Sequence, residues 1–198
     1  VADTSAIDYE SATTCTITVR ATSADGSTSD TVFTVTLTDV DEFDVGSATD
    51  TDSDANTLAE NVANGASAEI TASATDADGT TNTVTYAITA QSCSGAFAID
   101  SGSGAVTVAD TSAIDYEAGS TCTITVRATS ADGSTSDVMF TVTLTDVNDQ
   151  TPTYASADTT PSVAEGTTAV ETVAITDTDT SDSNTCALTG QDSSLFTC

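Results

Sequence analysis

"TCTITVRATSADGSTSDVMFTVTLTDVNDQTP", residues 121–152, contains two runs in which apolar and polar side chains alternate. The first run places Cys122, Ile124, Val126 and Ala128 on one face and Thr121, Thr123, Thr125 and Arg127 on the other. The second alternates Phe140, Val142 and Leu144 with Thr141, Thr143 and Thr145. Such alternation with β-branched residues is typical of half-buried antiparallel strands. The "SADGSTSD" between the runs predicts a turn. The second strand then runs into acidic residues and reaches Pro152.

Similar alternation occurs elsewhere in the chain. "NTVTYAIT" (82–89) and "AVETVAIT" (169–176) also predict strands, and no segment has a helical apolar stripe. About seven short strands in roughly 107 residues predict a two-sheet sandwich. The expected fold class is therefore all-β.

The chain is internally repetitive. Residues 1–40 nearly reappear at 108–147, and "VADTSAIDYE" and "TCTITVRATSADGSTSD" are identical in both places. The offset of 107 residues has the size of a domain and exceeds a solenoid unit. A weaker echo links residues 58–79 with 161–180. We therefore expect the second half of one repeat at 1–44, a complete repeat at 45–152 and the first half of a third at 153–198.

Two interpretations of these half-repeats remain open at this point. The 198 residues could be a segment of a longer array of repeats. They could instead be a subunit whose two halves complete neighbouring copies.

The composition is strongly acidic. Asp and Glu number 31 against two basic residues, Arg20 and Arg127, so the formal net charge is -29. Nucleic acids and anionic membrane surfaces both attract positive charge, so neither is an expected partner. No apolar run approaches the length of a membrane span, so direct membrane insertion is not expected. Acidic, polar chains are often disordered, but the patterned apolar residues argue against disorder here.

Five short motifs occur in order within the complete repeat: "AEN" with Glu60, "TDAD" with Asp76 and Asp78, "FAIDSGSGAVTV" (97–108), "IDYE" with Asp115 and Glu117, and "DVNDQTP" (146–152). This ordered set resembles the cadherin repeat, and in particular the cadherin-like tandem repeats of large bacterial surface and adhesin proteins. The resemblance extends over the whole chain. It implies Greek-key, immunoglobulin-like sandwiches joined end to end, with calcium bound between successive domains.

The resemblance also implies a ligand set at each of the two junctions. At the first junction the expected ligands are Asp8, Glu10, Asp39, Asp41, Glu42, Asp76 and Asp78. At the second junction they are Glu60, Asp115, Glu117, Asp146, Asn148, Asp149, Asp177 and Asp179. Calcium takes six to eight oxygen ligands, and the absence of His disfavours zinc and copper. Without a cation, so many like charges would repel each other.

The sequence departs from the family pattern in a few places. Asp41 and Glu42 stand where the family favours Asn and Asp. Ser23 and Ser130 stand where it has an aspartate, and Asp25 and Asp132, two residues further on, are candidates to substitute. "DTDSDAN" (50–56) lacks the Gly and distal Glu of an EF-hand loop and is interpreted as a solvated loop.

Five Cys in so polar a chain indicate an oxidising, extracellular setting. Cys93 and Cys122 are the only possible pair within the complete repeat, and Cys186 and Cys198 form the same kind of pair in the third. Cys15 is equivalent to Cys122. Its partner would lie upstream of residue 1, or would be Cys198 of an adjacent copy.

Catalysis is not expected, because the chain has no His for a triad, no Lys for a Schiff base and no phosphate-binding loop. The main hypothesis is a calcium-rigidified stalk or fibre segment at a cell surface, with neighbouring repeats or copies as partners and Ser and Thr as candidate carriers of O-linked glycan. The first alternative is an extracellular filament subunit, assembled head-to-tail by completing half-repeats between neighbours. The second alternative is a homophilic cell-adhesion module.

Overall fold

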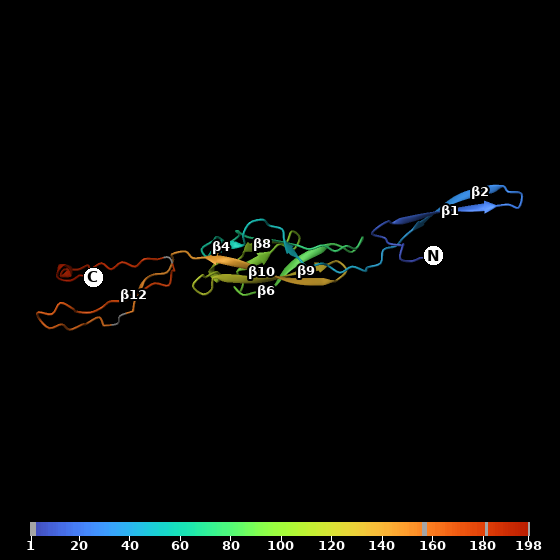
Figure 1. Ribbon diagram of the computed structural model, residues 1–198. Helices are drawn as coiled ribbons and strands as arrows, with labels where there is room; N and C mark the ends of the chain where they lie inside the picture. The colour runs from blue at the N-terminus through green and yellow to red at the C-terminus, as the bar shows by residue number, and fades with distance from the viewer. Residues whose placement is uncertain (1–2, 156–157, 181, 198) are drawn as a thin grey trace.

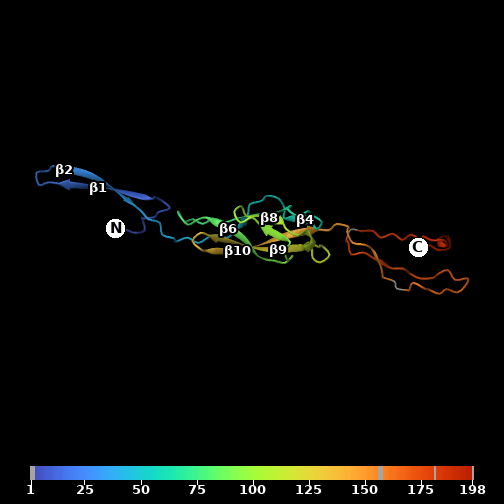
Figure 2. The ribbon, with the colours of Figure 1, turned by 180° about the vertical axis from the view of Figure 1, so that it is seen from behind.

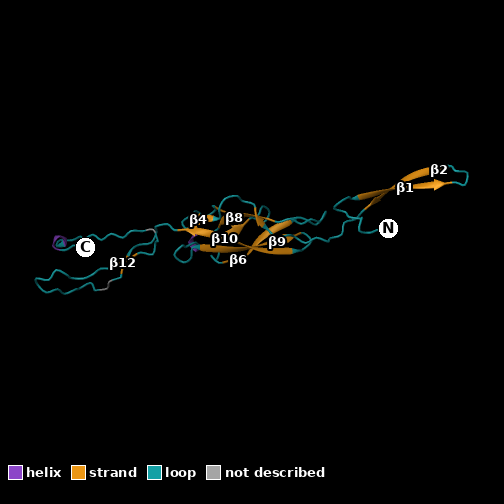
Figure 3. Ribbon diagram, viewed as in Figure 1, coloured by secondary structure: helices purple, strands orange, loops and turns teal. Residues whose placement is uncertain are grey.

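The computed structural model describes residues 3–155, 158–180 and 182–197. Figures 1 and 2, which view the molecule from opposite sides, show an elongated chain with a hairpin at one end and residues 158–197 at the other. Between them lies a two-sheet β-sandwich, which we call the central sandwich. Strands and loops account for almost all of the chain, as Figure 3 shows, so the predicted all-β class is confirmed.

The first sheet of the central sandwich has the strand order β4-β10-β9-β6. Its strands are β4 (Thr57–Ala59), β6 (Val84–Gln91), β9 (Thr121–Ser130) and β10 (Thr135–Thr145). β9 and β10 are the two strands predicted from residues 121–145, and they pair antiparallel with Cys122 opposite Val142. β4 joins the edge of the sheet parallel to β10.

The second sheet has the strand order β3-β5-β8-β7, and its paired strands are antiparallel. Its strands are β3 (Thr49–Asp50), β5 (Ser67–Ser73), β7 (Phe97–Ile99) and β8 (Ala105–Val108). β3 and β4 are close in sequence but belong to different sheets. The chain therefore crosses from one sheet to the other within residues 51–56, the segment interpreted from sequence as a loop.

The core lies between the two sheets and follows the alternation in the sequence. Ile70 and Val106 of the second sheet are 1% exposed, and Ile124 and Val142 of the first are fully buried. On β9 the side chains at 122, 124, 126 and 128 are all fully buried, and the Thr residues between them face outward. A disulfide joins Cys93 to Cys122, with their Cα atoms 5.5 Å apart, and so fastens the loop after β6 to the buried face of β9.

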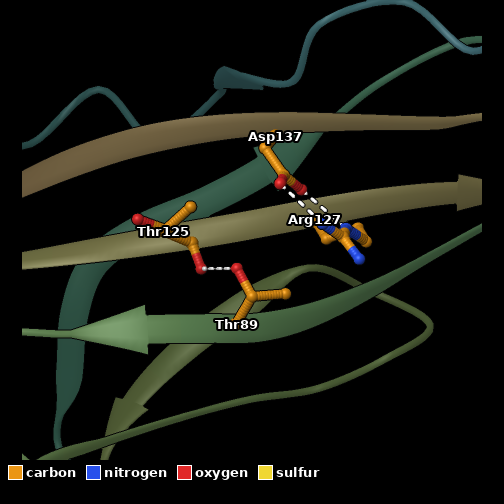
Figure 4. Close-up of polar contacts among 4 residues, drawn as sticks. All are labelled: Thr89, Thr125, Arg127 and Asp137. Carbon is orange, nitrogen blue, oxygen red and sulfur yellow. Dashed lines mark hydrogen bonds and ion pairs between the residues drawn. The ribbon is translucent and has the colours of Figure 1, made fainter.

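The outward face of the first sheet carries cross-strand polar contacts. Figure 4 shows Arg127 on β9 and Asp137 on β10 joined by two hydrogen bonds of 2.7 Å, and Thr89 on β6 donating to the backbone carbonyl of Thr125 at 3.3 Å. Arg20 and Asp30 make the same two-bond pair in the terminal hairpin. Both Arg residues of the chain are therefore already paired with a carboxylate.

The terminal hairpin consists of β1 (Thr14–Thr22) and β2 (Thr28–Thr36). Its register repeats that of β9 and β10, since Cys15 lies opposite Val35 as Cys122 lies opposite Val142. Its apolar face, however, is open. Ile17 is 52% exposed, whereas its counterpart Ile124 is fully buried.

Residues 158–197 contain little regular structure. β12 (Ile175–Thr176) pairs with β11 (Thr153–Tyr154), and a 3₁₀ turn, η2, spans Ser193–Leu195. The prediction of a strand over 169–176 is therefore wrong except at its last two residues. β5, its counterpart in the central sandwich, is flanked by β3 and β8, whereas within the described residues β12 pairs with β11 alone. A second 3₁₀ turn, η1 (Thr111–Ala113), follows β8.

Candidate metal centres

The first junction, between the terminal hairpin and the central sandwich, holds two groups of carboxylates. In one, oxygen atoms of Glu10, Asp39 and Glu42 lie within 4.8 Å of one another. The loop after Asp78 closes on this group, because the backbone N–H of Gly79 donates to Glu10 Oε1 at 3.1 Å and the Thr80 hydroxyl donates to Asp39. Residues from both sides of the linker therefore meet at one place.

The second group at this junction contains Asp41, Asp78 and Asp132, again with oxygen atoms within 4.8 Å of one another. Asp78 is only 1% exposed. Its Oδ1 accepts hydrogen bonds from the backbone N–H groups of Glu42 and Phe43 at 3.3 and 3.4 Å. The buried carboxylate thus holds the linker against the central sandwich.

The second junction, between the central sandwich and residues 153–180, has a similar arrangement. Its two groups are Glu60 with Glu117 and Asp146, and Glu117 with Asp149 and Asp179. Glu60 is 4% exposed, and its two oxygens accept hydrogen bonds from the backbone N–H groups of Tyr116 and Val147, each at 2.7 Å. Glu117 belongs to both groups, so it is the residue that connects them.

The segment after Asp177 closes on the second linker as the loop after Asp76 closes on the first. Asp179 is 6% exposed, and its Oδ2 accepts from the backbone N–H of Gln150 at 3.0 Å. The backbone N–H of Thr180 donates to Asp146 Oδ2 at 2.9 Å, and the Thr180 hydroxyl donates to the same atom. Asp78 and Asp179 thus occupy equivalent positions in the two junctions.

Four predicted carboxylate ligands lie outside these groups: Asp8, Asp76, Asp115 and Asp177. Asp8 and Asp115 are exposed and accept hydrogen bonds from the backbone N–H groups of their own turns. Asp76 and Asp177 each accept from the backbone N–H two residues on, at 3.1 Å. Asn148 is exposed.

Crowding of the carboxylates changes their acidity. Contact with the Asp78 carboxylate raises the pKa of Asp41 to about 6, and burial and the charge of Asp132 act in the same direction. Burial raises the pKa of Glu117 and of Asp179, and neighbouring carboxylates add to both shifts. These are the changes expected where like charges share a site and the charged form is disfavoured.

Several buried carboxylate oxygens at the two junctions have no hydrogen-bond donor among the described residues. At the first junction these are Glu10 Oε2, Asp39 Oδ1, Asp76 Oδ2 and Asp78 Oδ2; at the second they are both oxygens of Glu117, Asp177 Oδ2 and Asp179 Oδ1. Buried carboxylates are normally paired or coordinated to metal. The residues therefore fit a hard cation with oxygen ligands, such as calcium.

A further acidic group had not been predicted from sequence. Asp52, Asp54 and Glu69 have oxygen atoms within 4.8 Å of one another, and Asp50 accepts from the backbone N–H of Thr71 at 2.9 Å. The segment interpreted as a solvated loop is thus attached to the second sheet. Glu69 is distant in sequence and lies in no acidic motif, so no local signal identifies it.

The predicted pair of Cys186 with Cys198 stays a prediction, because Cys198 lies outside the described residues.

Comparisons with known proteins give a consistent result. Residues 54–145 match the cadherin domain family, and no curated protein sequence matches the chain. The structure is similar to mouse cadherin-23 EC22–24, with a TM-score of 0.71, 25% identity and coverage of 87% of this chain and 56% of that one. The protocadherin γB4 extracellular domain gives a TM-score of 0.65 at 25% identity, covering 88% of this chain and 30% of that one. A protocadherin γB7 EC3–6 structure described as a cis-dimer gives a TM-score of 0.63 at 22% identity, covering 88% of this chain and 44% of that one.

The chain thus spans little more than half of the cadherin-23 fragment and less of the two protocadherin structures. The family match implies an extracellular, adhesion-type repeat, and such repeats are non-enzymatic modules. Among the described residues, no helix has the length and apolarity needed to cross a membrane.

Proposed function

We propose, because residues 54–145 match the cadherin domain family, that the chain is a structural extracellular segment whose repeat junctions are made rigid by bound calcium. The observation that carries the proposal is the set of buried carboxylate oxygens without a hydrogen-bond donor at both junctions, within the part of the chain that the structure describes. The proposal is also supported by ten of the fifteen predicted ligands, which belong to the carboxylate groups at these two junctions.

The residues that would hold the cation come from both sides of each linker. At the first junction they are Glu10, Asp39, Asp41, Glu42, Asp76 and Asp78; at the second they are Glu60, Glu117, Asp146, Asp149, Asp177 and Asp179. Bound calcium supplies positive charge that offsets the repulsion among these carboxylates. The backbone contacts of Asp78 and Asp179 then hold each linker in one geometry.

A segment stiffened in this way would act as a stalk or fibre element that spaces an adhesive domain from the cell. The outward Thr residues of β10, which include Thr141 and Thr143, are exposed and are candidate carriers of O-linked glycan. The -29 charge would keep such segments soluble and apart where no cation joins them.

The test is a thermal melt of the 198-residue chain in excess calcium and in EDTA. Extracellular calcium modules bind in the range of about 10⁻⁴–10⁻³ M, so millimolar calcium should raise the Tm, because binding to the folded state stabilises it by mass action. Glu117→Gln should reduce this rise, since Glu117 belongs to both groups at the second junction. NaCl at matched ionic strength is the control for general screening. Equal Tm values in calcium and EDTA would refute the proposal.

A second candidate is a filament in which the halves of neighbouring copies complete one sandwich. It is favoured by the open face of the terminal hairpin, where Ile17, Val19 and Val35 are 52%, 50% and 46% exposed. Residues 161–180 echo 58–79, and so offer counterparts of β4 and β5. A counterpart of β8, which lies between β5 and β7, would still be needed. We therefore rank this candidate second; uniform fibres with an axial repeat in electron micrographs would reverse the order.

A further inference from the structure

The turn that contains Tyr9 reaches across the first junction and contacts the loop after β5. A Cβ atom at Gly79 would lie 2.8 Å from Cε1 and 2.9 Å from Cδ1 of the Tyr9 ring. The ring therefore fills the space that a side chain at residue 79 would need. Glycine at this position lets the aromatic ring lie directly against the backbone of the loop.

The backbone of Gly79 also bonds to this turn. Its N–H donates to Glu10 Oε1 at 3.1 Å, and the hydroxyl of the next residue, Thr80, donates to Asp39 of the linker. Both hydrogen bonds have a carboxylate as acceptor, and such bonds are stronger than those between neutral groups. We call the ring and the Gly79–Glu10 hydrogen bond together the Tyr9–Gly79 contact. It joins two units through protein atoms alone.

The second junction contains the same turn in a different setting. "IDYE" occurs at 7–10 and again at 114–117, so Glu117 corresponds to Glu10. Both oxygens of Glu117 are buried without a hydrogen-bond donor in the described part of the chain. The bond that Glu10 accepts from the next unit therefore has no counterpart at Glu117.

The difference follows from the residue after the buried aspartate of each loop. "DADGT" (76–80) has Gly79 between that aspartate and Thr80, whereas in "DTDT" (177–180) Thr180 follows at once. The hydroxyls of both threonines donate to an aspartate of the adjacent linker. The threonine contact is thus common to the two junctions, and the glycine adds the contact with the Tyr9 turn at the first.

We propose that the Tyr9–Gly79 contact holds the first junction when no metal is bound, and that it selects glycine at this position of the following repeat. The ring and the hydrogen bond oppose the repulsion among the neighbouring carboxylates. The inference concerns a junction of the proposed function, but it does not require calcium to bind. A repeat with a larger residue in place of Gly79 would be a poorer neighbour for the same turn.

The test measures bending at the first junction of the full 198-residue chain in EDTA. Two spin labels are attached on either side of the junction, through ketone side chains introduced at exposed loop positions so that the cysteines stay unchanged. We expect Gly79→Ala to broaden the distribution of distances between the labels. Gly79 has no positive φ, so alanine meets no left-handed strain and disturbs only the contact with the turn.

Gly119→Ala is the matched control, because the equivalent position already holds Ala12 and a Cβ at Gly119 meets no atom within 4 Å. It should leave the distribution unchanged. A Gly79→Ala distribution as narrow as that of the parent chain, or equal broadening in both variants, would overturn the inference. The rise of Tm in calcium, measured on the parent chain, tests the proposed function separately.

Amide hydrogen exchange at Gly79 tests the role of the ring without altering the central sandwich. In EDTA, Tyr9→Ala should exchange this N–H about two- to tenfold faster than the parent chain, which is the range that one hydrogen bond supplies. Tyr9→Phe keeps the ring and should match the parent chain. An unchanged rate in Tyr9→Ala would show that the ring does not hold the contact and would refute the proposal.

Discussion

Gly104 shows how strictly one residue can be constrained in this fold. It has φ +74°, and a Cβ at this position would lie 2.0 Å from the carbonyl oxygen of Ala72. β5 approaches the turn before β8 closely at this point, because the backbone N–H of Ala72 donates to the carbonyl of Gly104 at 2.9 Å. The close approach of two backbones therefore excludes any side chain here.

Gly104→Ala should lower the free energy of unfolding by about 2 kcal/mol or more, because it adds both a left-handed L-residue and a clash with backbone. Gly102→Ala is the matched control in the same turn, since its Cβ would meet Asp100 Oδ1 at 3.7 Å, an ordinary contact. Chemical denaturation measures the free energy of unfolding of both variants. Equal losses in the two variants would show that the backbone contact is not the constraint.

At the scale of elements, the two hairpins have nearly the same sequence and register but different surroundings. The β9–β10 hairpin packs against the second sheet, and Ile124 is fully buried. The β1–β2 hairpin has no covering sheet among the described residues, and Ile17 is half-exposed. A hairpin alone is marginally stable, so the β9–β10 pair owes its stability to the sheet packed on it.

Ile124→Ala should destabilise the central sandwich by about 2–5 kcal/mol, because it leaves a cavity in a close-packed core. Ile17→Ala should leave the same unfolding transition within about 0.5 kcal/mol, as for exposed positions in general. Urea denaturation of the two variants supplies the measurement. A large loss in Ile17→Ala would instead mean that the open face of the β1–β2 hairpin is covered in solution, as the filament candidate requires.

At the scale of the whole molecule, the junctions determine how the units are held in line. Among the described residues, the buried carboxylate oxygens that lack a hydrogen-bond donor lie at the junctions, and the two Arg residues are paired elsewhere, on sheet faces. The protein itself therefore supplies no counter-charge at either joint. If calcium holds the junctions as proposed, we expect repulsion between opposing acids to bend the chain when no cation is present.

Small-angle scattering should detect this difference. In calcium the distribution of interatomic distances should be that of an extended rod, and in EDTA at low salt it should broaden as the junctions bend. Raising NaCl in EDTA should reverse part of the broadening, since the Debye length falls from about 30 Å at 0.01 M to about 10 Å at 0.1 M. Superimposable curves in calcium and EDTA would contradict this expectation.

Much of the fold could be predicted because strand formation depends on local alternation. Residues 121–129 and 140–145 became strands with the predicted faces inward, and the repeat placed a second hairpin of the same kind at 14–36. Residues 169–176 failed as a predicted strand because a strand also needs hydrogen-bonding partners, and those are not a local property. Glu69 in the Asp52 group was missed for the same reason: its neighbours are distant in sequence.

Alternation, repetition and composition can be read along the chain, so they were enough to predict the all-β class, the repeat and the segments in which acidic residues gather. The surroundings of each copy of a repeated residue depend on packing and could be known only from the folded chain. Asp25 closes its own turn while Asp132 joins a cluster, and Ile17 is exposed while Ile124 is buried. The local sequences are identical in each case. The physical reason is that burial and carboxylate crowding arise from the segments packed around a residue, which differ between the two copies.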